Sequence, residues 1–335
     1  MDTPTTETSA RPKRRIRRRR TGVALLVVLV LVTLAYVGVS LVVYDKLSLT
    51  SAECGRTNQN TPASFTTAGI DTGLYLMPAY EAVTFASRDP GIDISAWYVA
   101  SDRGPTGPAV VLVHGHDACK REGRMLLAAG MLHRHGIGVL LIDLRNHGNS
   151  TVVNGRFAGG TREYNDALAG WDWLVDDRGY APDHVGLFGM SLGAATALIA
   201  TGEEPRVAAV WEDSSYADAD VAIQAELARN GYPTFLRYGG YVMALIRSGD
   251  DLLSLSPIGA VAKLDGRPIF ITHGSADSRL SPTYAADLAA AVRAHGGTVD
   301  PWIVDGAEHT EAIDLQPAEY ERRLDAFFES SLGEP

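Results

Sequence analysis

The sequence predicts an α/β domain, with a mostly parallel β-sheet covered by helices on both faces, preceded by one helix that could span a membrane. Two observations support this. Short apolar runs alternate with longer helical patterns over most of the chain, and strands that alternate with helices are joined by crossovers into a parallel sheet. A single uncharged apolar run, residues 22–43, precedes all of them.

Charge is distributed unevenly between the N-terminus and the rest of the chain. The 335 residues include 30 Lys and Arg and 40 Asp and Glu, and residues 1–20 hold eight of the basic and two of the acidic ones. The remaining 22 basic and 38 acidic residues give the body a formal charge of −16. A basic arm that binds nucleic acid normally accompanies a basic domain face, so we expect no nucleic-acid partner.

Residues 22–43 are long enough to cross a bilayer as a helix. At about 1.5 Å per residue they span roughly 33 Å, against a hydrocarbon core of about 30 Å. A cleaved signal peptide has a shorter apolar region, although the small residues at 38–40 would suit a peptidase. We interpret the run as a single-pass, uncleaved signal anchor in the cell membrane. Because positive charge stays in the cytoplasm, residues 1–21 should be a cytoplasmic tail, with the rest of the chain outside.

Residues 44–78 are rich in Ser, Thr, Asn and Gly, and we expect them to be a juxtamembrane spacer. The two cysteines of the chain are Cys54 in this segment and Cys119 farther on. An extracytoplasmic compartment permits a disulfide between them, but spacing in sequence cannot show that two sulfur atoms meet. We favour two unpaired thiols, and neither cysteine has the paired spacing of a metal site.

Residues 79–335 are expected to form the α/β domain. Residues 79–88 and 92–100 alternate apolar and polar side chains, which indicates an antiparallel pair of strands at one sheet edge. Apolar runs rich in Val and Ile, too short for helices, then predict buried strands at 109–114, 137–143, 185–190, 207–213 and 268–273. Helical patterns between them predict helices at 123–135, 161–177, 192–201 and 282–295.

In such a sheet, reactive groups collect at the carboxyl ends of the strands. The run 185–190 ends in GMSLG, which fits G-x-S-x-G, a sharp strand-to-helix turn that lifts the hydroxyl of Ser191 clear of the sheet. Gly189 and Gly193 would leave room where the strand and the helix pack closely. The pentapeptide alone is weak evidence in a chain with 34 Gly, but it falls on a predicted strand-to-helix junction.

A serine needs a base to remove its proton, and the base needs a third group to orient it. Of the nine histidines, His309 lies in a small polar loop after the apolar residues 302–304 and before a final amphipathic helix. Asp277, in the turn-rich loop after the strand at 268–273, supplies the acid, so the order along the chain is serine, acid, histidine. Asp213, at the end of the preceding strand, is the rival acid.

From about residue 79 to 332 the chain resembles the α/β-hydrolase superfamily, and within it the membrane-anchored bacterial hydrolases grouped with serine aminopeptidase-like and BEM46-like proteins. The matching motifs are VVLVHGH, VLLIDLRNHGNS, VGLFGMSLG, ITHGSADSRLSP and GAEH, in this order. The resemblance implies the α/β-hydrolase fold and an oxyanion loop that begins at the His-Gly pair. The backbone N–H groups of His116 and Leu192 would then stabilise the charge of a tetrahedral intermediate.

A metal site is a competing interpretation of the same segment, because His114, His116 and Asp117 are of types that bind zinc. The zinc hydrolase pattern His-x-His-x-Asp-His would need an aspartate one place later and a histidine where Cys119 stands. We therefore expect no metal, and acyl transfer through a serine needs no cofactor.

Residues 214–256 form a long insertion between two of the predicted strands. Tyr, Phe, Met and Leu recur there at helical intervals, which predicts a small packed helical cap. Caps inserted at this point commonly roof the pocket in the superfamily that the chain resembles.

Together these features predict a membrane-anchored serine hydrolase, esterase/lipase-like or peptidase-like, that cleaves an ester, amide or thioester of a small-molecule, lipid or peptide substrate through an acyl-enzyme. Two alternatives stay open. One is an acyltransferase that uses the same triad. The other is an inactive binding protein, since a fold does not imply a function.

Overall fold

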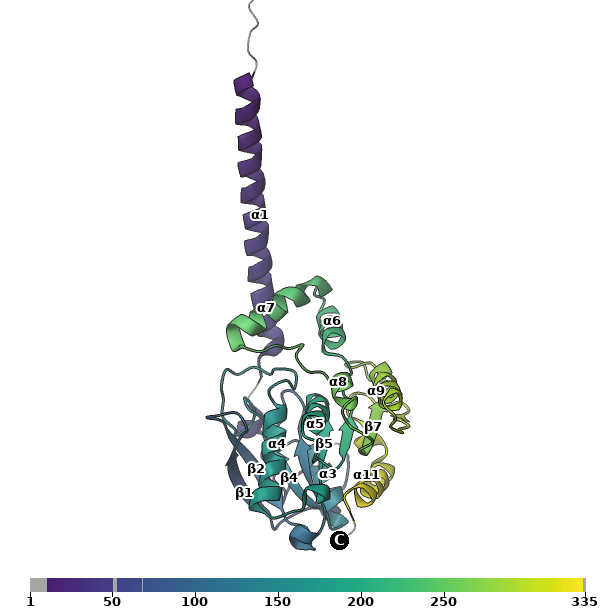
Figure 1. Cartoon of the computed structure of the whole chain (residues 1–335). Helices are drawn as coiled ribbons and strands as arrows, with labels where there is room; N and C mark the ends of the chain where they lie inside the picture. The colour runs from purple at the N-terminus through teal and green to yellow at the C-terminus, as the bar shows by residue number, and fades with distance from the viewer. Residues whose placement is uncertain (1–10, 51–52, 68, 334–335) are drawn as a thin grey trace, which may run out of the picture.

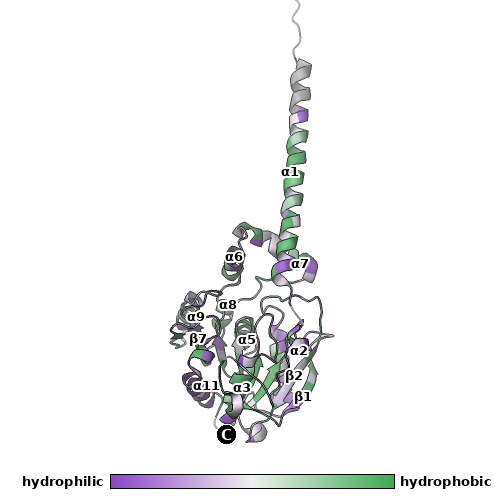
Figure 2. Cartoon of the chain, turned by 180° about the vertical axis from the view of Figure 1, so that it is seen from behind, coloured by the Kyte–Doolittle hydropathy of each residue, from purple (hydrophilic) through white to green (hydrophobic). Residues whose placement is uncertain are grey.

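Helix α1 (Arg11–Ser48) projects from an α/β body formed by the described residues that follow it (Figure 1). The computed structural model describes residues 11–50, 53–67 and 69–333, so the first ten residues of the expected cytoplasmic tail lie outside the described part. Within the described part, one helix is long and apolar enough to cross a membrane, at Arg19–Ser48. In Figure 2 the colour of α1 marks most of the part that stands clear of the body as hydrophobic.

The body is built on one eight-stranded sheet with the order β1-β2-β4-β3-β5-β6-β7-β8. Strands β3 to β8 pair in parallel, β1 pairs antiparallel with β2, and β2 pairs antiparallel with β4. The predicted mostly parallel sheet with an antiparallel pair at one edge is confirmed. The strands are β1 (Glu81–Ala86), β2 (Asp93–Val99), β3 (Ala109–Val113), β4 (Gly138–Ile142), β5 (Val185–Met190), β6 (Val210–Asp213), β7 (Ile269–Gly274) and β8 (Trp302–Val304).

Helices cover both faces of the sheet. One apolar layer packs against α4 (Tyr164–Asp172), α5 (Leu192–Glu203) and α9 (Thr283–Ala294), and the other against α3 (Gly123–Arg134) and α11 (Pro317–Ser331). In β3 the side chain of Val111 belongs to the first layer, and those of Val110 and Leu112 belong to the second. This burial on both faces explains why the central strands are continuous apolar runs.

The remaining helices are short, and two of them form the cap. Helices α6 (Ala219–Arg229) and α7 (Arg237–Ser248), with the one-turn η5 (Thr234–Leu236) between them, lie in the insertion at 214–256. The others are α2 (Glu53–Thr57), α8 (Pro257–Val261), α10 (Ala312–Leu315), η1 (Thr72–Tyr75), η2 (Gly104–Thr106), η4 (Pro182–His184) and the π-helical turn Trp173–Asp177 that continues α4.

The segment between α1 and β1 is not a spacer, contrary to the expectation for residues 44–78. Helix α1 continues to Ser48, and Phe65, Tyr75 and Met77 are buried in the layer that contains α3. A side chain at Gly130 of α3 would lie 2.4 Å from the carbonyl oxygen of Tyr75, so α3 and η1 are in close contact. The polar composition predicted a loop, but a few large apolar side chains attach that loop to the body.

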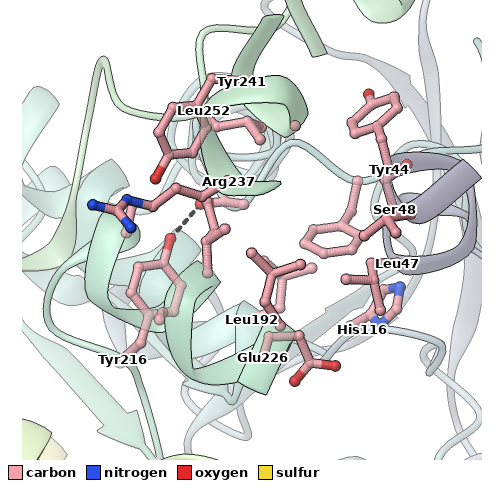
Figure 3. A pocket seen from close by; sticks show the side chains of 18 of the residues that line it. Tyr44, Leu47, Ser48, His116, Leu192, Tyr216, Glu226, Arg237, Tyr241 and Leu252 are labelled. Carbon is pink, nitrogen blue, oxygen red and sulfur yellow. Dashed lines mark hydrogen bonds between the residues drawn. The ribbon is translucent and has the colours of Figure 1, made fainter. Parts of the chain in front are cut away.

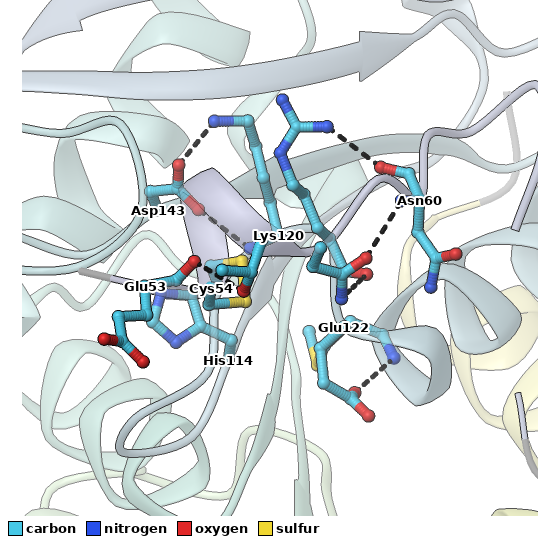
Figure 4. The surroundings of a disulfide bond; sticks show 12 residues. Glu53, Cys54, Asn60, His114, Lys120, Glu122 and Asp143 are labelled. Atoms are coloured by element: carbon cyan, nitrogen blue, oxygen red, sulfur yellow. Dashed lines mark hydrogen bonds and ion pairs between the residues drawn. A yellow bond between two sulfur atoms is a disulfide. The ribbon is translucent and has the colours of Figure 1, made fainter. Parts of the chain in front are cut away.

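This packing also overturns the expectation of two unpaired thiols, because Cys54 and Cys119 form a disulfide (Figure 4). The bond joins α2 to the loop that follows β3. Lys120, the residue after Cys119, is bound to Asp143. Its backbone N–H donates to the Asp143 carboxylate at 2.8 Å, and its ammonium group pairs with the same carboxylate at 2.5 Å. The loop after β3 is therefore attached both to the juxtamembrane segment and to the end of β4.

We predict that the double variant Cys54→Ser/Cys119→Ser has a lower free energy of unfolding than the wild type. The two cysteines are 65 residues apart, and closing a loop of that length in the unfolded chain stabilises a protein by about 4 kcal/mol in the chain-entropy model. Denaturant titrations with and without a reducing agent would measure the difference. The wild type should lose stability on reduction and the double variant should not, and equal midpoints in all four samples would contradict the prediction.

Candidate active site

Ser191 occupies a sharp turn between β5 and α5. Its backbone has φ 56° and ψ −121°, a conformation that costs a residue other than glycine about 1–3 kcal/mol. A side chain at Gly189 would lie 2.2 Å from the carbonyl oxygen of Gly193, and one at Gly193 would lie 2.0 Å from that of Val113. The two glycines of the motif are therefore required by the close approach of strand and helix. The N–H of Ser191 donates to Asp213 O at 2.8 Å, which holds the turn against β6.

The structure brings together the three side chains that the sequence predicted to form a triad. His309 Nε2 lies 2.8 Å from Ser191 Oγ, and His309 Nδ1 lies 2.7 Å from Asp277 Oδ2. The three residues follow β5, β7 and β8, so they meet at the carboxyl edge of the sheet. With Nδ1 protonated toward the carboxylate, Nε2 is left to accept the serine proton.

Asp277 is held as a carboxylate by four donors. Its Oδ1 accepts the backbone N–H groups of Arg279 and Leu280, at 2.9 and 2.8 Å, and its Oδ2 lies 3.1 Å from His273 Nε2 in addition to His309. Burial opposes ionisation, but the hydrogen bonds from the two histidines outweigh it and hold the pKa of Asp277 well below its usual range. An ionised Asp277 stabilises the imidazolium that forms when His309 takes a proton.

Asp213, the rival acid, holds the neighbouring loops instead. Its carboxylate accepts hydrogen bonds from the hydroxyls of Ser214 and Tyr320, at 2.8 and 2.9 Å, and burial raises its pKa. The Ser214 hydroxyl in turn accepts the backbone N–H of Thr310 at 3.2 Å. Asp213 thus supports the loop that carries His309, while Asp277 is the hydrogen-bonded partner of the imidazole.

Two further buried ionisable residues were not identified from the sequence: His273, which contacts Asp277, and Glu212, which lies near His273. His273 and Glu212 are fully buried, and burial raises the pKa of Glu212 to about 8. Burial disfavours the charged form of His273, but its hydrogen bond to Asp277 and the nearby Glu212 carboxyl raise its pKa overall. Both residues lie at the carboxyl ends of predicted strands, at 207–213 and 268–273. This position is the feature of the sequence that could have identified them as residues near the site.

The two residues predicted to supply the oxyanion donors, His116 and Leu192, belong to segments next to Ser191. Leu192 is the first residue of α5, where a backbone N–H has no partner within the helix. His116 follows Gly115. The Cα of Gly115 is so close to the turn at Ser191 that a side chain on Gly115 would lie 3.3 Å from Ser191 Cβ. His116, Ser191 and Leu192 line the same cavity.

The imidazoles of the His-Gly-His segment have structural partners. His114 Nδ1 lies 2.7 Å from Gly115 O, and its Nε2 accepts the N–H of Leu144 at 3.1 Å. Burial lowers the pKa of His114 to about 3, so the ring is neutral. His116 packs on Phe157, with ring centroids 4.3 Å apart. Among residues 11–50, 53–67 and 69–333, no group of three or more His, Cys, Asp or Glu could hold a metal ion.

A cavity of about 200 Å³ opens above Ser191, and three parts of the chain line it (Figure 3). Ser191, Leu192 and His116 come from the body, Tyr241 and other residues come from the cap, and Leu47 comes from the end of α1. The cap therefore roofs the cavity, and the N-terminal helix forms part of its wall. The lining residues on α1 and on the cap helices are Val43, Tyr44, Leu47, Ser48, Ala219, Ala222, Ile223, Glu226, Leu227, Leu236, Arg237, Gly240 and Tyr241.

Residues 128–335, well over half of the chain, match the model of the prolyl oligopeptidase family. The chain belongs to this family. It is therefore an α/β-hydrolase of the serine-hydrolase type, in a family of esterases and peptidases, and the resemblance to the superfamily is confirmed. The narrower resemblance, to serine aminopeptidase-like and BEM46-like proteins, is not confirmed, because the family model that matches is that of the prolyl oligopeptidases.

Individual relatives agree with this membership at the level of fold and class. The chain is similar to the Pyrococcus furiosus esterase Pf2001, with a TM-score of 0.62 and 19% identity over 82% of this chain and 98% of that one. It is 33% identical over 150 residues to an uncharacterised Mycobacterium tuberculosis protein, 44% of this chain and 50% of that protein. It is 35% identical over 101 residues to the thiohydrolase aneE of Aspergillus aculeatus, 30% of this chain and 31% of that enzyme. The matches thus span at most about half the length of these two curated relatives.

The buried Glu212 should make stability fall as the pH rises. Its pKa goes from the ordinary 4.5 in the unfolded chain to about 8 in the folded one, so the folded state binds more protons between these values. From about pH 5.5 to about pH 7.5 we expect the wild type to lose about 2 kcal/mol of unfolding free energy relative to Glu212→Gln.

Denaturant titrations of both proteins at the two pH values would measure this difference, and other titrating groups cancel in the comparison. Asp300→Asn, which removes a fully exposed carboxyl, is the control and should follow the wild type. Parallel pH profiles for the wild type and Glu212→Gln would show that Glu212 is ionised in the folded protein.

Proposed function

We propose that this protein is a membrane-anchored serine hydrolase that cleaves an ester, amide or thioester bond through an acyl-enzyme intermediate. The observation that carries the proposal is the position of His309, whose two ring nitrogens lie within hydrogen-bond distance of Ser191 Oγ and the Asp277 carboxylate. This is the arrangement that activates a serine hydroxyl and keeps the imidazole in the required tautomer.

The reaction would proceed in two steps, acylation of Ser191 and hydrolysis of the acyl-serine. Ser191 Oγ attacks the acyl carbon while His309 Nε2 takes the hydroxyl proton, and the same imidazole then gives that proton to the leaving group as the bond to the acyl carbon breaks. A water molecule next attacks the acyl-serine, with His309 again accepting and returning a proton. The products are the free acid, the leaving alcohol, amine or thiol, and a regenerated Ser191.

The negative charge of each tetrahedral intermediate needs donors that are already in place. We assign this role to the backbone N–H groups of His116 and Leu192. His116 follows Gly115, which lies against Ser191, and Leu192 is the first residue of α5. Losing one such donor typically lowers turnover about 100- to 1,000-fold. The attachment of the loop after β3 by the Cys54–Cys119 disulfide supports the placement of the His116 donor.

The anchor and its orientation are part of the proposal. Most of α1 stands clear of the body in Figure 2, and its apolar side chains from Val23 to Leu34 are exposed. Basic residues precede them in the sequence. Positive charge stays in the cytoplasm, so the catalytic domain would lie outside the cell membrane. The disulfide supports this orientation, because disulfides persist in oxidising compartments.

A fluorophosphonate probe should label the wild-type protein and leave Ser191→Ala unlabelled. The probe reacts with a serine only where a base has activated its hydroxyl, so labelling reports the whole arrangement. Mass spectrometry of the labelled peptide should place the adduct on Ser191. The control is Ser281→Ala, which removes an exposed serine close to Asp277 in sequence and should label like the wild type. A folded wild-type protein that stays unlabelled would favour the inactive binding protein.

A further inference from the structure

We propose that the substrate is a membrane lipid with an ester-linked acyl chain, and that the chain reaches Ser191 from the bilayer along the end of the anchor helix itself. This inference rests on the proposed function and adds the class of substrate and its route. Four features carry it: the wall that α1 contributes to the cavity, the mostly apolar lining of that cavity, an apolar stripe on α7, and the level at which α1 and α7 cross.

The wall comes first. Val43, Tyr44, Leu47 and Ser48, the last turns of α1, line the same cavity as Ser191. Figure 3 shows Leu47 and Tyr44 on one side of the cavity and the cap residue Tyr241 on the other. Helix α1 is therefore also part of the proposed binding site, because its side chains would contact a substrate bound in the cavity next to Ser191.

The cavity is suited to a hydrocarbon chain. Among the described residues that line it, only Glu226, Arg237 and Arg279 carry a charge. Glu226 is paired with Arg229, at 2.6 Å, and Arg237 lies 3.1 Å from Asp220. The rest of the lining from α1, α6 and α7 is mostly apolar. A hydrocarbon chain that binds there is transferred out of water, which is favourable by about 25 cal/mol for each Å² of apolar surface buried.

Helix α7 carries an apolar stripe that the body leaves uncovered. Tyr238, Val242, Leu245 and Ile246 follow one another at helical spacing and are 57%, 49%, 54% and 71% exposed. The opposite face of the helix, with Met243 and Ala244, is buried. A helix with one buried face and one exposed apolar stripe beside an apolar anchor is typical of a segment that lies in a membrane interface.

The crossing of α1 and α7 puts this stripe at the membrane surface. Counting from Gly22, about 20 helical residues cover a hydrocarbon core of about 30 Å, so the outer edge of the core falls near Leu41. Tyr36 stacks on Phe235, with ring centroids 6.1 Å apart, and its hydroxyl accepts the N–H of Gly239 at 2.9 Å. The contacts with α7 thus begin within the apolar span, as Figure 1 shows for the position of α7 across α1.

The two helices are in close contact at this crossing. A side chain at Gly239 would lie 2.0 Å from Ser40 Oγ, so α7 approaches α1 as closely as a glycine allows. Tyr44 is hydrogen-bonded to Ser248 at 2.8 Å, and Arg156 pairs with Asp45 at 2.8 Å. These contacts hold the end of α1 against both cap and body, so α1 would form one wall of the proposed route.

The test uses the full chain in phosphatidylcholine vesicles and two esters of one fluorogenic alcohol. 4-Methylumbelliferyl palmitate partitions into the bilayer, and 4-methylumbelliferyl acetate stays in water. We expect Leu47→Trp, which fills the α1 wall, to lower the ratio of palmitate to acetate turnover at least tenfold. Ile223→Trp fills the cavity from α6 and should act in the same way if Leu47→Trp fails to fold. Val42→Trp, on α1 but 65% exposed and outside the cavity lining, is the matched control.

A second pair of variants tests the stripe. Leu245→Asp/Ile246→Asp should lower the same ratio at least tenfold, because two charges keep α7 out of the interface. Leu315→Asp, which places a charge at an exposed leucine of α10 away from the cap, should leave it unchanged. Ratios within twofold of the wild type in the lining and stripe variants would overturn the proposal.

The outcome for the wild type separates this inference from the proposed function. Turnover of acetate without turnover of palmitate would overturn the lipid substrate alone and favour a water-soluble acyl compound. Turnover of neither ester, together with no fluorophosphonate labelling, would overturn both.

Discussion

The close packing of β5 against α5 at Ser191 is the constraint on which the rest of the site depends. Gly189 and Gly193 allow the strand and the helix to approach so closely that the serine between them takes a positive φ. That conformation directs the hydroxyl away from the sheet and leaves the N–H of Leu192 free of the helix ladder. The cost of the strained residue is met by the surrounding packing, since every residue from Leu192 to Gly202 is buried.

The other parts of the site are positioned by the edge of the sheet rather than by local sequence. Loops after β7 and β8 bring Asp277 and His309 to the serine. The buried Asp213 at the end of β6 supports the loop after β8 through the hydroxyl of Ser214. The loop after β3 is held by the disulfide and by Asp143. The same edge faces the cap and the end of α1, so the proposed reaction centre and the proposed membrane surface lie on one side of the molecule (Figure 1).

Much of the fold and the triad geometry was predictable because the signals are local or follow from chain order. Central strands such as β3 are continuous apolar runs since both faces are buried, and the strand-turn-helix motif marks Ser191 without any knowledge of its neighbours. Asp277 and His309 were predicted from the order serine, acid, histidine along the chain. Strand β8 is only three residues long and was noted as an apolar stretch without being predicted as a strand.

What the sequence did not predict depends on contacts between distant segments. The polar composition of residues 44–78 predicted a spacer, whereas Phe65 and Met77 pack into the core and Cys54 is bonded to Cys119. Glu212 and His273 lie at the ends of predicted strands, but only the fold shows that Glu212 is near His273 and that His273 contacts Asp277. The contribution of Leu47 to the cavity wall depends on how α1 meets the cap, a contact that the apolar pattern of the anchor does not indicate.

The most direct measurement of the central claim is a crystal structure of the full chain after reaction with a long-chain alkyl phosphonate. We expect a bond from phosphorus to Ser191 Oγ, with one phosphonyl oxygen about 2.7–3.1 Å from the backbone nitrogens of His116 and Leu192. We also expect the alkyl chain to lie against Leu47 on α1. A phosphonyl oxygen directed away from both nitrogens, or an adduct on another residue, would show that the proposed site is wrong.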